Sequence, residues 1–281
     1  MRWNILPELP EVETIRSGLE VSVMGGQVRS VEVIHTGSIK EVTIARFRRT
    51  LAGATLSSFD RRGKFLIISL DVSDALIVDF RMTGQLIHEG DQGVLPPHTH
   101  VVFRMVGGTR LRFTDTRKFG SIRLVRADQV CNHPALSKLG VDAMGDDLTT
   151  GHLANLTAAS KRPIKQLLMD QRRIAGIGNI YASEILFHAG IHPQTEASSL
   201  KPEAIRILRS SIRHILRVAI RRCGTTMRDF RTASGGYGNY QNEFRVYARE
   251  NRPCRRCATP VVRIRQHGRS TFFCPQCQQA E

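Results

Sequence analysis

The sequence predicts an α+β protein of several domains, with a β-sandwich or barrel first, a helical domain second and a small cysteine-rich module last. Seven short runs rich in β-branched and aromatic residues lie between residues 28 and 125, separated by turn residues. Three stretches with apolar residues at helical spacing follow between residues 164 and 222. Two Cys-x-x-Cys pairs then come close to the C-terminus.

The first predicted domain covers residues 7–128 and opens with a helix. Pro10 suits a first helical turn, apolar residues then recur at near-helical spacing as far as Val23, and Gly25-Gly26 ends the helix. The strands are expected at Val28–Ile34, Thr55–Phe59, Phe65–Leu70, Ala75–Phe80, Thr99–Met105, Leu111–Thr114 and Ser121–Val125.

The second predicted domain covers residues 129–231 and is helical. We expect helices at Ile164–Met169, Tyr181–His188 and Pro202–Arg222, the last of which stops at Cys223-Gly224. Residues 232–244 are rich in Gly, Ser and Asn and are expected to form a loop. Residues 245–281 form the cysteine-rich module.

The charge of the chain indicates a polyanionic partner. Lys and Arg total 41 against 25 Asp and Glu, which gives a net charge of +16. Basic chains of this kind most often bind nucleic acid, although a basic protein without such a partner is the alternative. No apolar run reaches the roughly 20 residues of a membrane span and no secretory signal is evident. We therefore expect a cytoplasmic protein without a membrane partner, and a monomer is the default assumption.

The cysteine-rich module has the spacing of a zinc site. Cys254, Cys257, Cys274 and Cys277 form two Cys-x-x-Cys pairs separated by 16 residues. Four thiolates close a tetrahedron around one structural Zn²⁺ and leave no open position for catalysis. Two chance Cys-x-x-Cys pairs or a redox pair are the alternatives. The segment between the pairs is expected to form a hairpin with a basic tip at Gln266–Ser270, whereas Cys131 and Cys223 are isolated and receive no role.

A second local pattern concerns phosphate. Gly176-Ile177-Gly178-Asn179 precedes a predicted helix, and glycines there let the backbone amides approach an anion at the positive end of the helix dipole. Asn179 is either a phosphate donor or a helix cap, and the spacing alone favours the cap. Several Lys and Arg residues just upstream favour phosphate.

Taken together, several motifs resemble those of the formamidopyrimidine-DNA glycosylase family, along essentially the whole chain from Pro7 onward. The motifs are PELPEVET (Pro7–Thr14), RRGKFL (Arg61–Leu66), RMTGQL (Arg81–Leu86), DTRKFG (Asp115–Gly120), GIGNIYASEILF (Gly176–Phe187), GTTMRDF (Gly224–Phe230) and the four cysteines. The resemblance implies a β-sandwich, a helix–two-turns–helix domain and a zinc ribbon. It also implies base-excision repair of duplex DNA, with removal of 8-oxoguanine and formamidopyrimidines followed by cleavage of the abasic site.

The resemblance implies the catalytic residues. The Pro7 nitrogen would attack C1′ of the damaged nucleotide, Glu8 would act as general acid and base, and Glu11 would support them. Lys64 would face the lesion and its phosphate, and Arg269 would hold a neighbouring phosphate. Without the resemblance, Pro7 and Glu8 would be taken for helix-start residues and Lys64 for an exposed turn residue.

The resemblance also implies the DNA contacts. Met82, Arg117 and Phe119 would fill the gap left by the extruded base, although without the motif Met82 and Phe119 would be taken for core residues on strands. The remaining contacts would come from His98, Arg117, Lys165, Asn179 and Arg269. The segment Ser234–Gln241, with Tyr237 and Tyr240, would close over the base. Asp79 and Phe80-Arg81 depart from the family pattern of His and Leu-Gly, which affects the details of the Met82 turn.

Six residues precede Pro7 and would acylate its nitrogen, which removes the lone pair that the reaction needs. Three explanations are open: translation starting at Leu6 followed by removal of the initiator Met, proteolytic trimming, or a paralogue that binds lesions without cleaving DNA. Of these, a start at Leu6 is favoured, because every other matched site residue is present.

Two other functions remain open. An endonuclease VIII-like enzyme would prefer oxidised pyrimidines, but the PELPE motif, the three gap-filling residues and the long loop favour purines. A non-enzymatic zinc-ribbon protein would bind lesions with a steep salt dependence and would form no covalent adduct.

Overall fold

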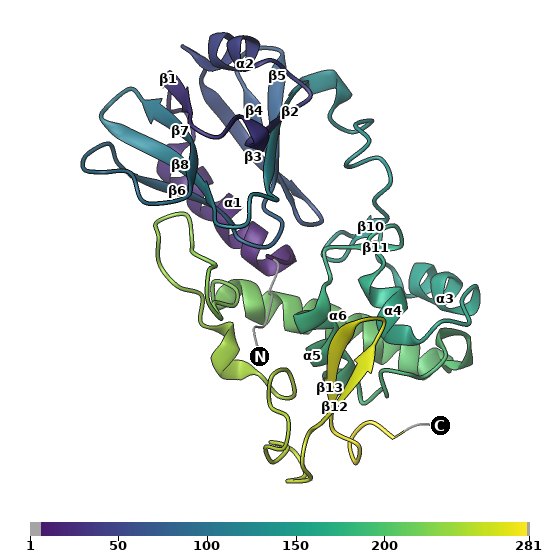
Figure 1. Cartoon of the computed structure of the whole chain (residues 1–281). Coiled ribbons are helices and arrows are strands. Elements are labelled where there is room, and N and C mark those ends of the chain that lie inside the picture. Colours follow the sequence, from purple (N-terminus) through teal and green to yellow (C-terminus); the bar gives the residue numbers. More distant parts are fainter. Residues whose placement is uncertain (1–6, 280–281) are drawn as a thin grey trace. The chain divides into compact units, whose positions relative to one another are not determined.

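The computed structural model describes residues 7–279, and the contacts between them divide the chain into two compact units (Figure 1). The first unit holds the residues up to 137 together with 222–239, and the second holds 138–221 and the residues from 240 onward. The chain therefore leaves the first unit and returns to it before entering the zinc ribbon. The predicted domain boundaries at 128, 231 and 244 stay a prediction.

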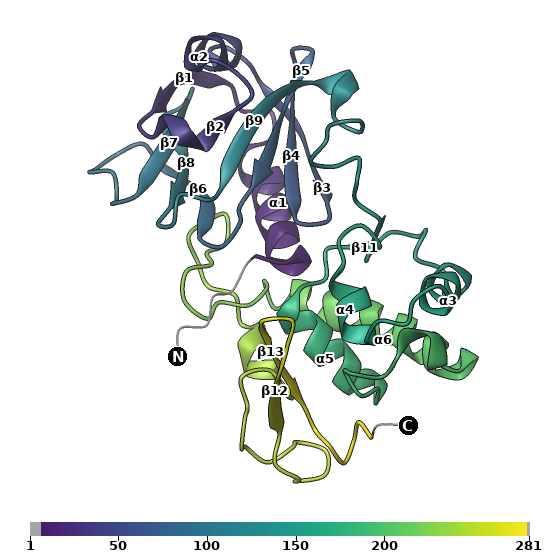
Figure 2. The same cartoon turned by 45° about the vertical axis from the view of Figure 1, so that its right-hand side comes forward.

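The first unit is built from two sheets, as the strand pattern predicted. One sheet has the order β1-β7-β8-β6 and the other the order β2-β9-β5-β4-β3 (Figure 2). The strands are β1 (Val28–Val33), β2 (Ile39–Lys40), β3 (Leu56–Arg62), β4 (Phe65–Leu70), β5 (Asp74–Asp79), β6 (Gly84–Gly90), β7 (Thr99–Met105), β8 (Thr109–Asp115) and β9 (Ser121–Arg126).

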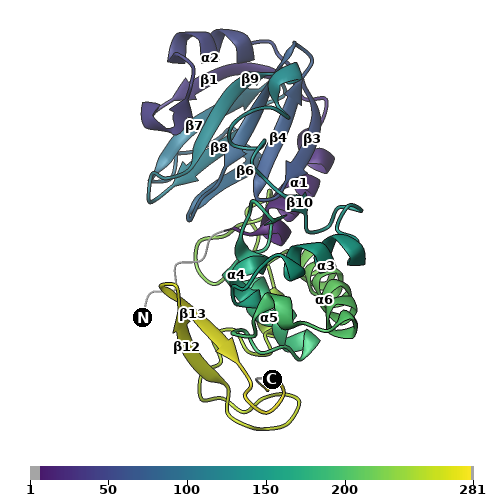
Figure 3. The ribbon, with the colours of Figure 1, turned by 90° about the vertical axis from the view of Figure 1, so that its right-hand side faces the viewer.

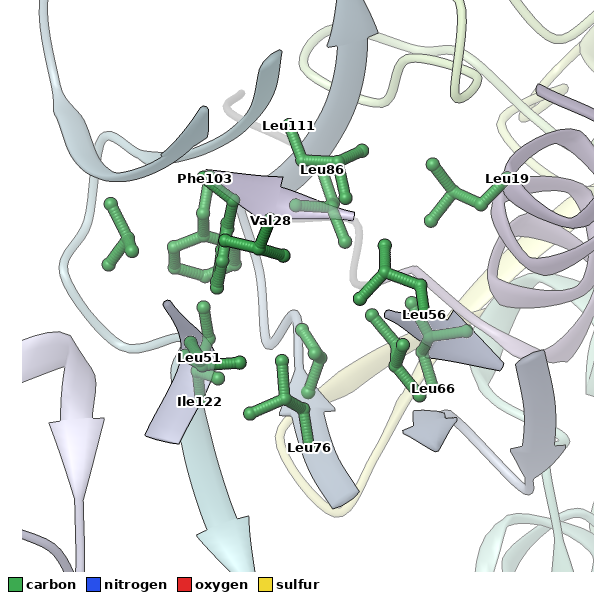
Figure 4. Packing of buried hydrophobic residues seen from close by; sticks show 14 of the residues in the cluster. Leu19, Val28, Leu51, Leu56, Leu66, Leu76, Leu86, Phe103, Leu111 and Ile122 are labelled. Atoms are coloured by element: carbon green, nitrogen blue, oxygen red, sulfur yellow. The ribbon is translucent and has the colours of Figure 1, made fainter. Parts of the chain in front are cut away.

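One hydrophobic core joins the two sheets (Figure 4). Leu86, Phe103 and Leu111 come from the four-stranded sheet and are at most 3% exposed. Leu66 and Leu76 come from the five-stranded sheet and are at most 1% exposed. Both sheets thus bury one face against the other, which is the packing of a β-sandwich.

The first helix, α1 (Leu9–Val23), begins where the sequence predicted. Glu8 and Glu11 form a capping box, and Pro10 occupies the first turn, where its missing N–H is harmless. The apolar stripe of the helix is buried in the core, against β3, β4 and β6. This packing places the segment before the helix, which contains Pro7, at a defined position of the sandwich.

Among the α-helices and strands of residues 7–279, six were not predicted: α2 (Ile44–Leu51), α3 (Thr150–Ala158), β2, β6, β10 (Val141–Asp142) and β11 (Ile174–Ala175). The α2 helix carries three arginines among its eight residues, but Thr43 caps it and Phe47 and Leu51 are buried. Strand β6 starts and ends with glycine, which local reasoning assigns to turns. Its pairing with β8 along seven residues overrides that preference.

The second unit consists of helices and a hairpin (Figure 3). Besides α3, its helices are α4 (Ile164–Met169), α5 (Asn179–Ala189) and α6 (Pro202–Arg221), its short parallel pair is β10 (Val141–Asp142) and β11 (Ile174–Ala175), and its hairpin is β12 (Val262–Gln266) and β13 (Arg269–Phe273). Helix α5 packs against α6, α4 and β13. The three helices predicted from sequence and the hairpin are confirmed.

A buried carboxylate joins helix α5 to the segment that precedes the cysteines. Glu184 is 1% exposed and accepts hydrogen bonds from the backbone N–H groups of Arg245, Val246 and Tyr247 at 2.8–3.0 Å. Burial raises the pKa of Glu184, and the three amide donors oppose that shift. Helix α5 therefore holds the start of the zinc ribbon. Within residues 7–279 no helix is long and apolar enough to cross a membrane.

Candidate active site and nucleic-acid interface

Pro7 lies in the first unit, in a narrow pocket at the start of α1. Pro7 and Glu8 are both buried, Glu8 with 3% exposure. The pocket is lined by Pro7, Glu11, Met82, Thr83, Gly84, Thr225, Met227, Arg228, Asp229 and Phe230. The structure thus brings the proposed nucleophile together with Met82, one of the three proposed gap-filling residues. Residues 1–6, on which the expectation about the N-terminus rests, lie outside the described range.

Glu11 connects two chain segments that are far apart in sequence. Its Oε2 accepts a hydrogen bond from the Glu8 N–H at 2.9 Å, and its Oε1 accepts one from the Thr225 N–H at 2.7 Å. Gly224 has φ +73°, and a Cβ there would lie 2.9 Å from Glu11 Oε1. Only glycine therefore lets the GTTMRDF segment approach this carboxylate so closely. Sequence reasoning gave Glu11 a supporting role but did not identify Thr225.

The three proposed gap-filling residues lie on two turns rather than on strands. Met82 lies on the turn between β5 and β6 and is half-buried, whereas Arg117 and Phe119 lie on the turn between β8 and β9. Phe119 is 55% exposed, and the Arg117 guanidinium lies 5.0 Å above its ring. The alternative of core residues on strands is therefore wrong. An exposed phenylalanine backed by an arginine is available to a partner.

Asp79 and Arg81, which depart from the family motif, bond to each other in the structure. Arg81 has φ +49°, a conformation that favours glycine. Asp79 Oδ1 accepts the Arg81 N–H at 3.1 Å, and Asp79 Oδ2 pairs with Arg81 Nε at 2.7 Å. Burial raises the pKa of Asp79, and Arg81 opposes this. One carboxylate therefore holds an arginine in the turn next to Met82.

Hydrogen bonds hold the glycine-rich loop, residues 232–244, against other segments of the first unit. The Gly238 N–H donates to Thr226 Oγ1 at 2.8 Å, and the His88 N–H donates to the Ala233 carbonyl at 2.7 Å. Tyr237 is 62% exposed, with the Arg231 guanidinium 4.3 Å above its ring. Tyr240 differs, because it is 2% exposed and packs against Tyr181 and Phe244 in the second unit. Tyr237 is thus an exposed residue of the loop, whereas Tyr240 is buried and anchors its end.

Lys64 and His98 both occupy tight turns of the sandwich. Gly63 and Lys64 form the two-residue turn between β3 and β4, and Lys64 is half-buried. His98 is exposed with φ +63°, and its carbonyl accepts the Asp115 N–H at 3.1 Å.

The second unit gathers the residues proposed to hold phosphate. Lys165 is 2% exposed, and its Nζ donates to Asn179 Oδ1 and Thr271 Oγ1, both at 2.8 Å. Asn179 Nδ2 in turn donates to the Ser270 carbonyl at 3.0 Å. A pocket of about 200 Å³ is lined by Lys165, Gln166, Met169, Asp170, Asn179, Gln266, His267, Arg269 and Thr271. Three elements, α4, the start of α5 and β13, therefore meet at one basic site.

The cap interpretation of Asn179 is wrong. Gly178 is the N-cap residue of α5, and Asn179 is the first helical residue. Because its side chain bonds to Lys165 and to β13, Asn179 joins the helix start to the hairpin that carries Arg269. Arg269 is exposed and begins β13, next to a turn in which His267 and Gly268 both have positive φ. Such a turn suits a two-residue hairpin.

The four predicted cysteines form a zinc site. Their sulfur atoms lie within 4.8 Å of one another, and the Cys254–Cys277, Cys257–Cys274 and Cys257–Cys277 separations are 4.0, 3.4 and 3.4 Å. A tetrahedron with Zn–S bonds of about 2.3 Å has an edge of about 3.8 Å, so the donor set fits one structural Zn²⁺. Hydrogen bonds from Thr259 lower the pKa of Cys257 to about 6, whereas burial raises the pKa of Cys274 and raises that of Cys277 to about 12. Binding of Zn²⁺ must therefore displace protons from the latter two thiols.

Family comparisons cover most of the chain. The family model for the formamidopyrimidine-DNA glycosylase N-terminal domain matches residues 6–122, and the model for the H2TH domain of the same family matches residues 139–231. A model for the zinc finger found in FPG and IleRS matches residues 252–280. The expected helix–two-turns–helix domain and zinc ribbon are thus confirmed.

Individual proteins agree. A formamidopyrimidine-DNA glycosylase of Moorella thermoacetica is 45% identical over 92% of this chain and 95% of its own length. The enzyme of that name from Bacillus subtilis is 38% identical over 97% of this chain and 99% of its own. The Lactococcus lactis Fpg, solved in complex with DNA containing an abasic site, superposes with a TM-score of 0.91 at 33% identity, covering 97% of this chain and 99% of that one. The chain therefore belongs to the formamidopyrimidine-DNA glycosylase family.

Proposed function

We propose that this chain is a bifunctional DNA glycosylase and abasic-site lyase that removes oxidised purines from duplex DNA. The observation that carries the proposal is the pocket in which Pro7 lies beside Glu11 and Met82, with Glu8 next in the chain. Solved structures of the Lactococcus lactis Fpg contain DNA with an abasic site or with Fapy-dG, which supports the substrate class.

In the proposed reaction the Pro7 nitrogen attacks C1′ of the damaged nucleotide and the base leaves. A terminal α-amine has a pKa near 8, against about 10.4 for lysine, so more of it is unprotonated and nucleophilic at pH 7. A secondary amine yields an iminium that is cationic without a proton. This cation draws electrons during elimination of the 3′ phosphate and then the 5′ phosphate, with Glu8 transferring protons at the sugar.

The remaining residues divide between the two units. Met82, Arg117 and Phe119 would fill the gap in the duplex, Lys64 and His98 would contact DNA near the lesion, and Tyr237 would lie over the base. Lys165, Asn179 and Arg269 would hold phosphates. The four cysteines hold one structural Zn²⁺, which stabilises the hairpin that carries Arg269. We propose a cytoplasmic monomer that associates with the nucleoid when bound to DNA.

The reaction requires a free Pro7 nitrogen, which Leu6 acylates in the printed chain. The test compares the full chain with a chain that begins at Pro7, using borohydride trapping on an abasic duplex. We expect a covalent adduct only with Pro7 at the N-terminus, and mass spectrometry of the native protein to find that N-terminus. If the form with a free Pro7 gave no adduct, the proposal would be wrong.

The lesion class is tested separately. Excision rates are measured on matched duplexes carrying 8-oxoguanine, a formamidopyrimidine or an oxidised pyrimidine. The third substrate is included because one Lactococcus lactis Fpg structure contains an oxidised pyrimidine. We expect faster excision of both purine lesions, and a reversed order would favour the endonuclease VIII-like alternative.

A further inference from the structure

The two turns that carry the gap-filling residues lie at the same end of one sheet. Strand β6 starts at Gly84 and β8 ends at Asp115, and these two residues pair across the antiparallel ladder. The turn with Met82 directly precedes β6, and the turn with Arg117 and Phe119 directly follows β8. The register therefore places two turns, 30 or more residues apart in sequence, next to each other.

Asp115 connects these two turns. Its side chain is fully buried, and its Oδ1 accepts hydrogen bonds from the Thr83 hydroxyl and from the Arg117 N–H, the latter at 3.1 Å. Its Oδ2 accepts the Gly120 N–H at 2.6 Å. Thr83 adds a second connection, because its Oγ1 also accepts the Arg117 N–H at 3.1 Å.

Each gap-filling residue carries one of these bonds or is adjacent in the chain to a residue that does. Thr83 follows Met82 directly, Arg117 is bonded through its own N–H, and Phe119 lies between Arg117 and Gly120, both of which are bonded to Asp115. Gly120 leaves little room for change, since a Cβ there would lie 3.1 Å from Asp115 Oδ2 and 2.9 Å from the Phe113 ring. Two otherwise separate turns thus share one buried carboxylate.

We propose that Asp115 is the positioning residue that makes Met82, Arg117 and Phe119 one rigid wedge, with Thr83 as its connection to Met82. This inference rests on the proposed function, because it assigns these three residues to filling the duplex. Asp115 is fully buried and would not touch the lesion, whereas Thr83 also lines the Pro7 pocket. A wedge held in advance avoids ordering two turns at the moment of base extrusion, when stacking and pairing are lost.

The test measures extrusion without covalent chemistry, so it does not depend on the state of Pro7. The probe is 2-aminopurine placed next to 8-oxoguanine, and stopped-flow fluorescence follows unstacking. One duplex pairs the lesion with cytosine, and a second places it opposite a one-nucleotide gap, where extrusion is easier. The variants are Asp115→Asn, which cannot accept both backbone N–H groups, and Thr83→Val, which removes only the hydroxyl.

We expect both variants to slow extrusion from the paired duplex at least about tenfold and from the gapped duplex less than about threefold. Thr83→Ser should restore the wild-type rate. Thr157→Val is the matched control, because it removes another buried threonine hydroxyl, in α3. Thermal melting shows whether each variant is folded, and Thr83→Val carries the test if Asp115→Asn does not fold.

Equal slowing on both duplexes, or no slowing on either, would overturn the inference and leave the proposed function intact. A wild-type protein that binds the duplex but never raises the fluorescence would overturn the proposed function and this inference together.

Discussion

At the scale of single residues, Glu11 shows how one carboxylate can assemble a site. Its two oxygens accept backbone N–H groups from Glu8 and Thr225, which are separated by more than 200 residues in sequence. A carboxylate has acceptors on both oxygens, whereas an amide has one acceptor and one donor. Glutamine at this position would therefore set an NH₂ group against a backbone N–H in a buried place.

We predict that Glu11→Gln lowers borohydride trapping at least about tenfold and destabilises the protein by about 1–3 kcal/mol, because one buried donor loses its partner. Trapping on an abasic duplex and guanidinium denaturation measure the two effects. Glu20→Gln, on the same helix but with a 42% exposed side chain, is the control and should change neither. Wild-type behaviour of Glu11→Gln would contradict the role given to this residue.

The Asp79–Arg81 pair makes a second prediction at this scale. The left-handed backbone conformation at position 81 costs a non-glycine residue about 1–2 kcal/mol, and Arg81→Gly removes that cost. The ion pair that is lost contributes little, because the Arg81 side chain is 57% exposed. We therefore expect Arg81→Gly to be neutral or stabilising, whereas Asp79→Ala should be destabilising because the Arg81 N–H loses its acceptor. Denaturation midpoints measured side by side would show the difference. If Arg81→Gly is the more damaging change, the arginine has a further function.

At the scale of elements, the start of α5, helix α4 and strand β13 form the basic site through Lys165. The lysine is buried, and it bonds to side chains from the other two elements. A cation in such a place both holds the elements together and adds positive charge at a helix N-terminus, where an anion is favoured.

We predict that Lys165→Ala weakens DNA binding about equally for damaged and undamaged duplexes, and lowers the slope of log affinity against log salt by about 1. Fluorescence anisotropy at several salt concentrations measures both quantities. Lys161→Ala removes an exposed lysine of the same segment and serves as the comparison. A defect confined to lesion DNA would instead place Lys165 among the lesion contacts.

At the scale of the whole molecule, zinc and charge decide what the chain can bind. The module around the cysteines buries few large apolar side chains of its own, so its fold depends on the metal. The net charge of +16 makes binding to any polyanion strongly salt-dependent.

We predict that removal of zinc by a chelator unfolds the hairpin and abolishes DNA binding, while the sandwich keeps its structure. Acidification should release zinc as well, because protons compete with the metal for the four cysteine sulfurs. Metal analysis, circular dichroism and anisotropy on one titration series would check this. Full DNA affinity in the zinc-free protein would refute it.

How much the sequence could predict depended on how local each signal is. The α1 start, the strands β4 and β7, the helix α4 and the cysteine set all depend on residues within a few positions of one another, and all were predicted correctly. Strand β6 was missed because its bounding glycines indicate turns locally. The roles of Pro7 and Phe119 came only from the motif resemblance, since their local surroundings favour a helix start and a core residue.

The sequence by itself determined most of the helices and strands, which residues bind zinc, and that the partner is a polyanion, because periodicity, ligand spacing and charge are properties of the chain alone. The tertiary structure decided that Thr225 meets Glu11, that Lys165 meets Thr271, and that Thr83 and Arg117 share Asp115. The Thr83–Asp115, Lys165–Thr271 and Glu11–Thr225 contacts join residues 32, 106 and 214 positions apart. They depend on strand order and on the return of residues 222–239 to the first unit, neither of which a local pattern encodes.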